Sequence, residues 1–249
     1  MKDRYFTVTV TPDITASKQH TAAFTAGDVL FDWTEVQIPK GTSRLIGGAM
    51  LVRGKGNAAC TANKFGSFLL FSSTNTQTLG TLNSTPDKAP SNDLLGLLEL
   101  EDATSFAHSN LKGTTVGMAG RASNTSTQAN VLITGTQTGD NVGYDKIYIG
   151  ALAAGAFDFT TINRINDGDI DTTSPGTSLV CDGTSMDLTR HFIAGDVLHA
   201  HDDAVIGTVA SVAGSTEITL TEAIATGVLE DDDYVYSLNP IKIILYFEK

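Results

Sequence analysis

The chain is 249 residues long, with 41% hydrophobic residues, 18% charged residues and a net charge of −12 at pH 7. This length allows one or two domains with a sizeable core, and the hydrophobic content excludes a globally disordered chain. A surface that binds nucleic acid or an anionic membrane needs clustered Lys and Arg, so the acidic balance argues against both partners. No apolar run approaches the roughly 18 residues that span a bilayer. The first residues alternate without an apolar signal segment, which predicts a protein folded in a cytoplasm.

Alternation of apolar and polar residues dominates the first two thirds of the chain and predicts β-strands. Strands are expected at Tyr5–Val10, Asp28–Trp33, Arg44–Val52, Phe65–Ser72, Leu97–Leu100, Ala129–Thr134 and Lys146–Leu152. Gly47-Gly48 indicates a bulge or a close backbone approach within the third of these. Residues Ser91–Gly96 are expected to form one helical turn with a cap at Ser91. The Thr-, Ser-, Asn- and Gly-rich segments 73–92 and 107–128 are expected to be long loops, and helices to be minor.

All of the net charge lies in the next stretch. Residues 162–238 hold 14 acidic side chains and two basic ones, whereas acidic and basic side chains balance over the rest of the chain. Such an asymmetry indicates a second folded unit. The stretch is followed by Ile241–Glu248, a β-prone run that has the pattern of a last strand of the first unit. We therefore predict a neutral β domain formed by residues 1–161 and 239–249, with an acidic β module inserted at 162–238.

The acidic module is also rich in strand patterns. Strands are expected at Thr177–Cys181, Asp196–Ala200, Ala204–Val212, Glu217–Leu220 and Tyr234–Ser237. About five short strands suit a small barrel or a compact sandwich. The predicted fold class is therefore all-β: a jelly-roll-like β-sandwich with an inserted small acidic β-barrel-like module.

A search for chemistry-bearing motifs finds no catalytic residue. His199 and His201 lie two apart on an expected strand and would share a face, and with Asp202 they are the candidate ligands of a divalent metal. No further ligand is identifiable, so a solvated strand end that runs into an acidic turn is the favoured interpretation. The sequence predicts neither a metal nor a cofactor, and it predicts that the protein is not an enzyme.

Two acidic runs invite comparison with cation sites. Asp167–Asp171 has the alternating carboxylates of a calcium loop, but Thr172 and Ser178 stand where an EF-hand has its glycine and its glutamate. Glu230–Asp233 is either a solvated turn or a weak cation site. Polar linkers and turns are the favoured interpretation of both runs.

Basic and aromatic side chains of the neutral domain offer candidate contact sites. Arg53, Lys55 and Lys64 flank a glycine-rich loop, and they are either ordinary solubility residues or a docking edge for an acidic neighbour. Trp33 is the only tryptophan and ends an expected strand. At that position a core or interface role is favoured over a platform for sugar stacking.

Several segments follow an order known from one class of protein. In the neutral domain they are Asp28-Val-Leu-Phe-Asp-Trp-Thr-Glu-Val, Gly47-Gly-Ala-Met-Leu-Val-Arg, Phe68-Leu-Leu-Phe-Ser, Leu79-Gly-Thr-Leu-Asn and Asp93-Leu-Leu-Gly-Leu-Leu-Glu-Leu. This order resembles β-sandwich virion proteins of tailed phages, particularly those of marine and cyanobacterial hosts. The module separately resembles small β modules of phage structural proteins, through Phe192–Leu198, Ile206–Val212 and Ser215–Thr221. The resemblance implies a virion structural role and carries over no functional residue.

The expected function is a non-enzymatic virion component that decorates or associates with the capsid of a tailed phage, after synthesis in the host cytoplasm. Its expected partners are the major capsid protein or other virion proteins, with Arg53, Lys55 and Lys64 as the capsid-docking candidates. Self-association as a homo-oligomer is also expected, with a trimer favoured because capsid lattices offer threefold positions. The acidic runs Asp202-Asp203 and Glu230–Asp233 are expected to face solvent, because burying carboxylates costs desolvation energy.

Three alternatives remain open. A tail, neck or fibre component would belong to the same class of virion protein. A carbohydrate-binding module or adhesin would use exposed aromatic residues such as Trp33, Tyr144 and Tyr148, against which the aromatic content of 7% counts. A hydrolase would need a metal at His199 and His201.

Overall fold

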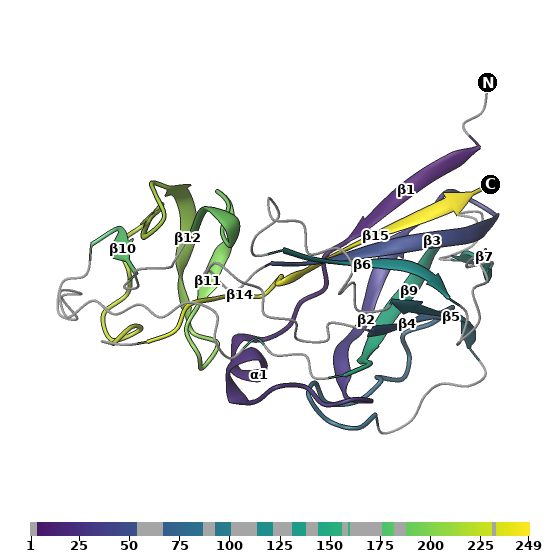
Figure 1. Ribbon diagram of the computed structural model, residues 1–249, viewed down its shortest axis with the longest axis horizontal. Coiled ribbons are helices and arrows are strands. Elements are labelled where there is room, and N and C mark those ends of the chain that lie inside the picture. The colour runs from purple at the N-terminus through teal and green to yellow at the C-terminus, as the bar shows by residue number, and fades with distance from the viewer. Residues whose placement is uncertain are drawn as a thin grey trace.

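The structure is a computed structural model, and it describes residues 4–53, 67–86, 93–100, 114–121, 131–137, 144–155, 159, 176–181, 188–230 and 233–249. Its regular elements are nearly all strands, which form a ten-stranded and a five-stranded antiparallel sheet. The five-stranded sheet lies at one end of an elongated molecule, and the N- and C-terminal residues lie at the other end (Figure 1). Within the described ranges, no helix is long and apolar enough to cross a membrane.

The larger sheet is folded over into two layers. It contains β1 (Tyr5–Val10), β2 (Val29–Gln37), β3 (Thr42–Arg53), β4 (Ser67–Ser72), β5 (Leu94–Leu100), β6 (Thr114–Arg121), β7 (Val131–Thr134), β8 (Thr136–Gln137), β9 (Tyr144–Ala153) and β15 (Ile241–Glu248). The strand order is β1-β15-β3-β6 in one layer and β5-β4-β9-β2 in the other, with β7 paired to β3 and β8 to β9. The β5–β6 pair joins the two layers.

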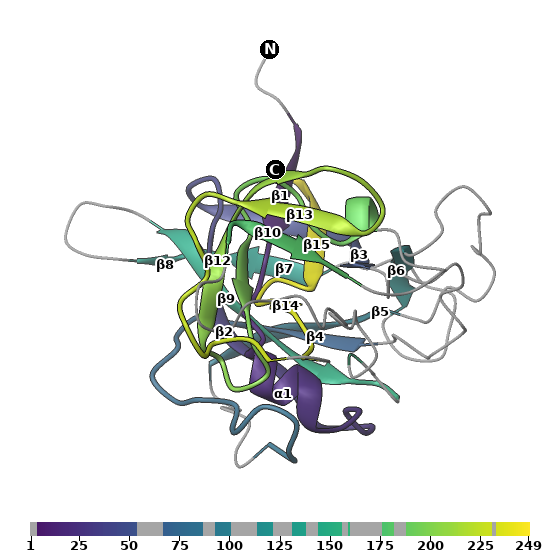
Figure 2. The ribbon, with the colours of Figure 1, turned by 90° about the vertical axis from the view of Figure 1, so that its left-hand side faces the viewer.

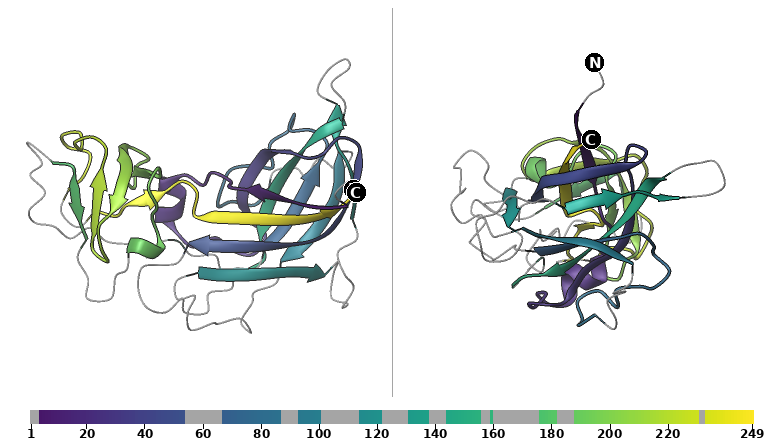
Figure 3. Two further views of the ribbon diagram at one scale, coloured as in Figure 1. Left: turned by 90° about the horizontal axis from the view of Figure 1, so that it is seen from above. Right: turned by 90° about the vertical axis from the view of Figure 1, so that its right-hand side faces the viewer.

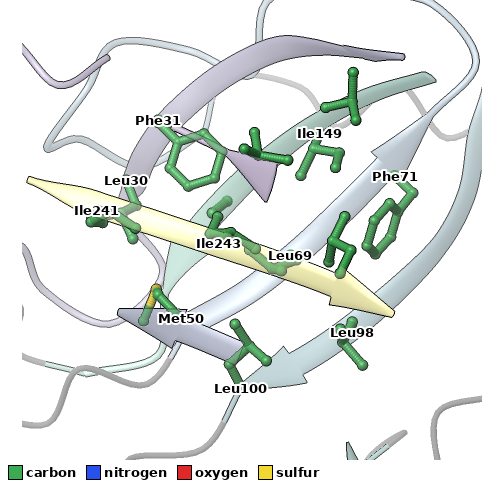
Figure 4. Packing of buried hydrophobic residues seen from close by; sticks show 14 of the residues in the cluster. Leu30, Phe31, Met50, Leu69, Phe71, Leu98, Leu100, Ile149, Ile241 and Ile243 are labelled. Atoms are coloured by element: carbon green, nitrogen blue, oxygen red, sulfur yellow. The ribbon is translucent and has the colours of Figure 1, made fainter. Parts of the chain in front are cut away.

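The core of the sandwich lies between these layers. Ile241 and Ile243 of β15 face Leu69 of β4 and Ile149 of β9 across the interior (Figure 4). All four of these side chains are fully buried. Seen from above, the molecule shows the two layers of the sandwich, and the separate small sheet lies beside them (Figure 3, left). The expected all-β sandwich is therefore confirmed.

Strand β15 belongs to the sandwich, as its sequence predicted. It pairs with β1 on one side and with β3 on the other, so it is an interior strand. Its burial follows a period of two: the core-facing residues Ile241, Ile243, Leu245 and Phe247 are fully buried, whereas Lys242 is exposed. Each such buried side chain contributes about 1.5–3 kcal/mol, so the last strand of the chain stabilises the first domain.

Gly47 and Gly48 of β3 mark both a bulge and a close backbone approach, which the sequence offered as alternatives. Tyr246 of β15 pairs with Gly47 and Phe247 pairs with Leu45, so Ile46 is the extra residue of a bulge. A Cβ atom on Gly48 would lie 3.2 Å from the carbonyl oxygen of Ile244. The neighbouring backbone therefore comes too close for a larger residue to fit without adjustment.

The acidic module has its own sheet and its own core. The sheet contains β10 (Ser178–Val180), β11 (Val197–His199), β12 (Val205–Val212), β13 (Glu217–Leu220) and β14 (Tyr236–Ser237). The order is β10-β13-β12-β11-β14, with β10 and β14 at the two edges; β10, β13 and β12 face the viewer in Figure 2. A 3-10 turn spans Leu188–Arg190. Each of these strands falls within one of the ranges expected from the sequence.

The two cores share no residue. One cluster runs from Val10 to Phe159 and resumes at Ile241, and the other runs from Leu179 to Val235. The second predicted boundary, at residue 239, lies between β14 and β15. The first boundary, at residues 161 and 162, lies outside the described residues.

The helical turn expected at Ser91–Gly96 is wrong where the structure describes it. Strand β5 begins at Leu94, which pairs with Ser72 of β4, and Gly96 pairs with Phe71. A Cβ atom on Gly96 would lie 2.3 Å from a methyl group of Val131. The strand is therefore set by a ladder and a close contact with β7, neither of which a local helix pattern can report.

Two further elements differ from expectation. Strand β6 lies within the segment 107–128 that was expected to be a loop, and it pairs with both β3 and β5. Glycine-rich sequence is tolerated there because a ladder on each side satisfies the backbone. Helix α1 (Ala16–Thr21) was also not expected. With six residues it is too short to show the sustained period by which a helix is recognised in a sequence, and Thr15 at its start makes no side-chain cap hydrogen bond.

Candidate functional site

Helix α1 connects the sandwich to the module (Figure 1). The backbone N–H of Ser17 donates to Oδ1 of Asp203 at 3.0 Å, and the Ser17 hydroxyl donates to Oδ2 at 2.6 Å. Asp203 holds a left-handed conformation, with φ of 73°, in the turn between β11 and β12. One carboxylate of the acidic module is therefore occupied by an intramolecular contact, which corrects the expectation that both Asp202 and Asp203 face solvent.

A buried amide reinforces this junction. The side chain of Gln19 donates from Nε2 to the carbonyl oxygens of Ile14 at 2.7 Å and of Ser237 at 2.8 Å. The backbone N–H of Ile14 donates to the carbonyl oxygen of Leu238 at 2.7 Å. These bonds satisfy polar groups that are largely shielded from water, so breaking them costs more than an exposed hydrogen bond would.

Aromatic and imidazole rings pack on the same junction. Nδ1 of His20 lies 2.7 Å from the hydroxyl of Tyr236, and its ring centroid lies 5.3 Å from that of His201 and 5.5 Å from that of Tyr234. Burial raises the pKa of Tyr236, with the nearby Tyr234 as a smaller cause. Nδ1 of His201 lies 3.7 Å from Oδ1 of Asp233.

The candidate metal ligands do not gather at one point. Strand β11 ends at His199, so His201 lies in the following turn rather than on the same strand face. His199 is buried, and its Nδ1 lies 3.0 Å from the carbonyl oxygen of Asp203. Asp202 accepts a hydrogen bond from the backbone N–H of Ala204. Across the described ranges, no group of three or more His, Cys, Asp or Glu side chains is placed to hold a metal.

The acidic runs are only partly within the described residues. Asp167–Asp171, Asp231 and Asp232 lie outside them. At the ends of the second run, the backbone N–H of Glu230 donates to Oδ2 of Asp233 at 2.7 Å. This contact joins the two described ends of the run.

The capsid-docking candidates fall at and beyond the end of β3. Arg53 is the last residue of that strand, and its side chain lies outside the described part of the structure, as do Lys55 and Lys64 in full. Their role as a docking edge stays a prediction.

The aromatic residues proposed for sugar binding are not displayed as a platform. Trp33 is half-buried, packs against Val29, Leu70 and Leu79, and donates from Nε1 to the carbonyl oxygen of Gln77 at 2.7 Å. Tyr148 is buried. The side chain of Tyr144 lies outside the described residues. Of these three candidates, Trp33 is therefore half-buried against neighbouring side chains and Tyr148 is buried.

A basic and apolar surface, which sequence reasoning missed, lies at the end of the sandwich far from the module. Across the strands β1, β15, β3 and β7, a row is formed by paired neighbours, in the order Tyr5, Glu248, Arg44 and Leu132. Arg4 and Lys249 flank the row, and Arg4, Thr42, Arg44, Leu132, Glu248 and Lys249 are among the residues that line a shallow hollow there. We call Arg4, Arg44, Leu132, Glu248 and Lys249 the Arg44 corner.

Charge and exposure distinguish this corner from the rest of the sheet. Leu132 at one end of the row is 66% exposed, and Tyr5 at the other end is 60% exposed. Nε of Arg4 donates to Oε1 of Glu248 at 2.7 Å, and Nη1 of Arg44 lies 3.5 Å from Oε2 of the same carboxylate. The single acidic residue is therefore shared by two arginines, and the corner keeps a positive balance. Only the strand register brings these residues together, so no sequence signal could have found them.

Comparison with known protein families, curated proteins and solved structures finds no match for this chain.

Proposed function

We propose that this protein is a non-enzymatic virion structural protein of a tailed phage, built as a jelly roll that associates with the capsid. The observation that carries the proposal is the strand order. If β1, β2, β3, β4, β5, β6, β9 and β15 are counted from one to eight, the layers follow the orders 1-8-3-6 and 5-4-7-2. That order is expected when a pair of Greek keys is wound into a sandwich, which is the jelly-roll arrangement.

Jelly rolls recur in viral capsid proteins and in lectins, so the fold alone supports two classes of function. The aromatic residues help to choose between them. Trp33 and Tyr148 contribute to packing rather than to an exposed platform, which weighs against a sugar site built on these two residues; the exposed tyrosines, Tyr5 and Tyr246, lie on β1 and β15. The resemblance of both parts of the chain to phage structural proteins favours the virion class.

The place of the acidic module fits a capsid-associated role. It is inserted immediately before the last strand of the sandwich, and it projects from one end of the molecule (Figure 1). Packaged DNA repels a module with this charge, and burial of its carboxylates in an interface is costly. We therefore assign docking on the lattice to the sandwich, through Arg53, Lys55 and Lys64, and an outward position to the module.

The proposed mechanism is surface complementarity repeated over a lattice. The partner is the major capsid protein or another virion protein, and self-association of the sandwich contributes further contacts. Individually weak contacts sum by avidity when many copies bind one particle, so no single strong site is required. The proposal places the protein in the virion after synthesis in the host cytoplasm.

Binding of the purified protein to phage particles that lack it tests this function. We expect saturable binding that follows the copy number of a lattice position and weakens as salt is raised. Reversing charge with Arg53→Glu and Lys55→Glu should reduce binding, whereas the matched change Asp233→Asn in the module should leave it nearly unchanged. Absence of binding at any salt concentration, or loss of binding only on changing the module, would contradict the proposal.

A further inference from the structure

The two ends of the molecule carry opposite charge and exposed apolar side chains. The module holds the whole net charge of −12, whereas the Arg44 corner has three basic residues and one acidic residue. Strand β10 lies at the end of the molecule farthest from β7 and from the N- and C-terminal residues (Figure 1). The opposite end, where the C-terminal residue lies, faces the viewer in the right-hand view of Figure 3.

The outer edge of the module mirrors the Arg44 corner. Strand β10 is an edge strand, and its Val180 pairs directly with Glu217 of β13. Val180 is 41% exposed and Glu217 is exposed. The hydroxyl of Ser178 donates to Oε1 of Glu217 at 2.9 Å, which orients the carboxylate and leaves Oε2 for another donor. We call Ser178, Val180 and Glu217 the Glu217 edge.

Each of the two surfaces includes a charged residue that pairs directly with an exposed aliphatic residue on the neighbouring strand. On the Arg44 corner the pair is Arg44 and Leu132, and on the Glu217 edge it is Glu217 and Val180. Direct cross-strand neighbours have Cβ atoms about 4.5–5.5 Å apart, so the two residues of each pair are attached at a similar spacing on the two surfaces. An arginine and a carboxylate pair well in this setting, and the aliphatic groups would shield the pair from water.

We propose that the Arg44 corner of one molecule binds the Glu217 edge of a second copy of this chain. Arg44 pairs with Glu217 of the neighbour, and Leu132 packs against Val180 of the neighbour. Because the two surfaces lie at opposite ends, one molecule cannot join them internally, so the contact links molecules head to tail. Such a heterologous contact closes into a ring when its rotation permits, and otherwise it forms a chain.

The proposed function includes self-association of the protein, and this contact describes how two copies would meet. In that respect the inference rests on the proposed function. The carboxylate that it uses, on Glu217, is separate from Asp202 and Glu230, which are both exposed. Any closed ring, including the trimer favoured from the sequence, would satisfy every corner and every edge.

Sedimentation equilibrium of the purified full-length chain, from micromolar to millimolar concentration at low and high salt, tests the proposal. The average mass should rise with concentration, and salt should weaken the association. Arg44→Glu alone and Glu217→Lys alone should each weaken association on the order of ten-fold to a hundred-fold. The double variant should associate again, because its corner glutamate then meets the lysine on the edge of the next copy. An equimolar mixture of the two single variants should recover only in chains or in rings with an even number of copies, because the variants must alternate.

Matched controls carry the same charge changes elsewhere. Lys242→Glu alters an exposed residue at the other end of β15, and Asp202→Lys alters an exposed residue of the module near α1. Neither should change the association constant by more than about two-fold. Arg44→Glu places a second carboxylate beside Glu248 and can disturb the fold of the corner. Glu217→Lys tests the same contact without this risk, because Glu217 lies in the separate sheet of the module.

Three results would overturn the inference. They are a monomer at every concentration, unchanged association of both single variants, and failure of the double variant to recover while it stays folded by circular dichroism. The sedimentation assay contains no phage particle. A negative result therefore overturns only the head-to-tail contact, whereas the proposed function is tested by the binding of the protein to particles.

Discussion

Replacing Ile243 by alanine should destabilise the sandwich and leave the module folded. Ile243 lies in the middle of β15, is fully buried, and packs with residues of both layers (Figure 4). Removing a buried isoleucine side chain in this way costs about 2–5 kcal/mol. That is a large part of the roughly 5–15 kcal/mol by which a native domain is stable.

The single tryptophan gives a direct assay. Trp33 packs within the sandwich, so its fluorescence during urea unfolding reports that domain alone. Ile243→Ala should lower the urea midpoint of the fluorescence transition, whereas Lys242→Ala on the exposed face of the same strand should change stability by less than about 0.5 kcal/mol. Leu198→Ala, in the separate core of the module, should leave the urea midpoint of the Trp33 fluorescence transition unchanged. It should lower only the midpoint of the module, which is followed by far-ultraviolet circular dichroism.

Removal of the whole strand extends the same reasoning. A chain that ends after Asn239 loses the four buried side chains of β15, at about 1.5–3 kcal/mol each, together with its ladders to β1 and β3. The loss approaches the total stability of the domain, so the Trp33 signal should be that of unfolded protein in water. A shortened chain with a native fluorescence spectrum, or a loss below about 1 kcal/mol for Ile243→Ala, would refute the assignment of β15 to the sandwich core.

Three further changes have outcomes that the structure predicts. Gly150→Ala would place a Cβ atom 2.4 Å from Leu79 and 3.2 Å from Trp33, so the urea midpoint should fall by an amount equal to about 1–3 kcal/mol, with a shifted Trp33 emission. Ser17→Ala removes the hydroxyl bond to Asp203 and should cost about 0.5–1.5 kcal/mol, seen as faster amide exchange in α1. Burial raises the pKa of Tyr236, so the unfolded chain loses this proton first and stability should decline as pH rises above about 10; Tyr236→Phe should remove that part of the decline in alkaline unfolding experiments.

The sequence predicted those features of the fold that local pattern and charge encode. The alternation of Ile241, Ile243 and Leu245, placed after an acidic stretch, was sufficient to assign β15 to the first domain. The module strands were also recognisable, because each is a short β-prone run between turn residues. Strand β6 was not, since its two glycines suggest a loop until β3 and β5 are seen to pair with it on both sides.

The candidate sites were harder to predict than the fold. The pattern of His199 and His201 suggested a shared face, but the chain turns after His199 and gives the two rings different neighbours. The Arg44 corner depends on the register between β3, β7 and β15, which brings Arg44, Leu132 and Glu248 together from distant parts of the chain. Register is fixed by the whole sheet, so single-sequence patterns do not report it.

Quantitative mass spectrometry of purified phage particles tests the central claim most directly. A capsid-associated protein should be present at a constant ratio to the major capsid protein, on the order of hundreds of copies per particle, as repeated lattice positions require. A dozen copies or fewer would place it in the neck, tail or fibre instead. Its absence from washed particles, with the protein recovered only from the lysate, would contradict a virion structural role.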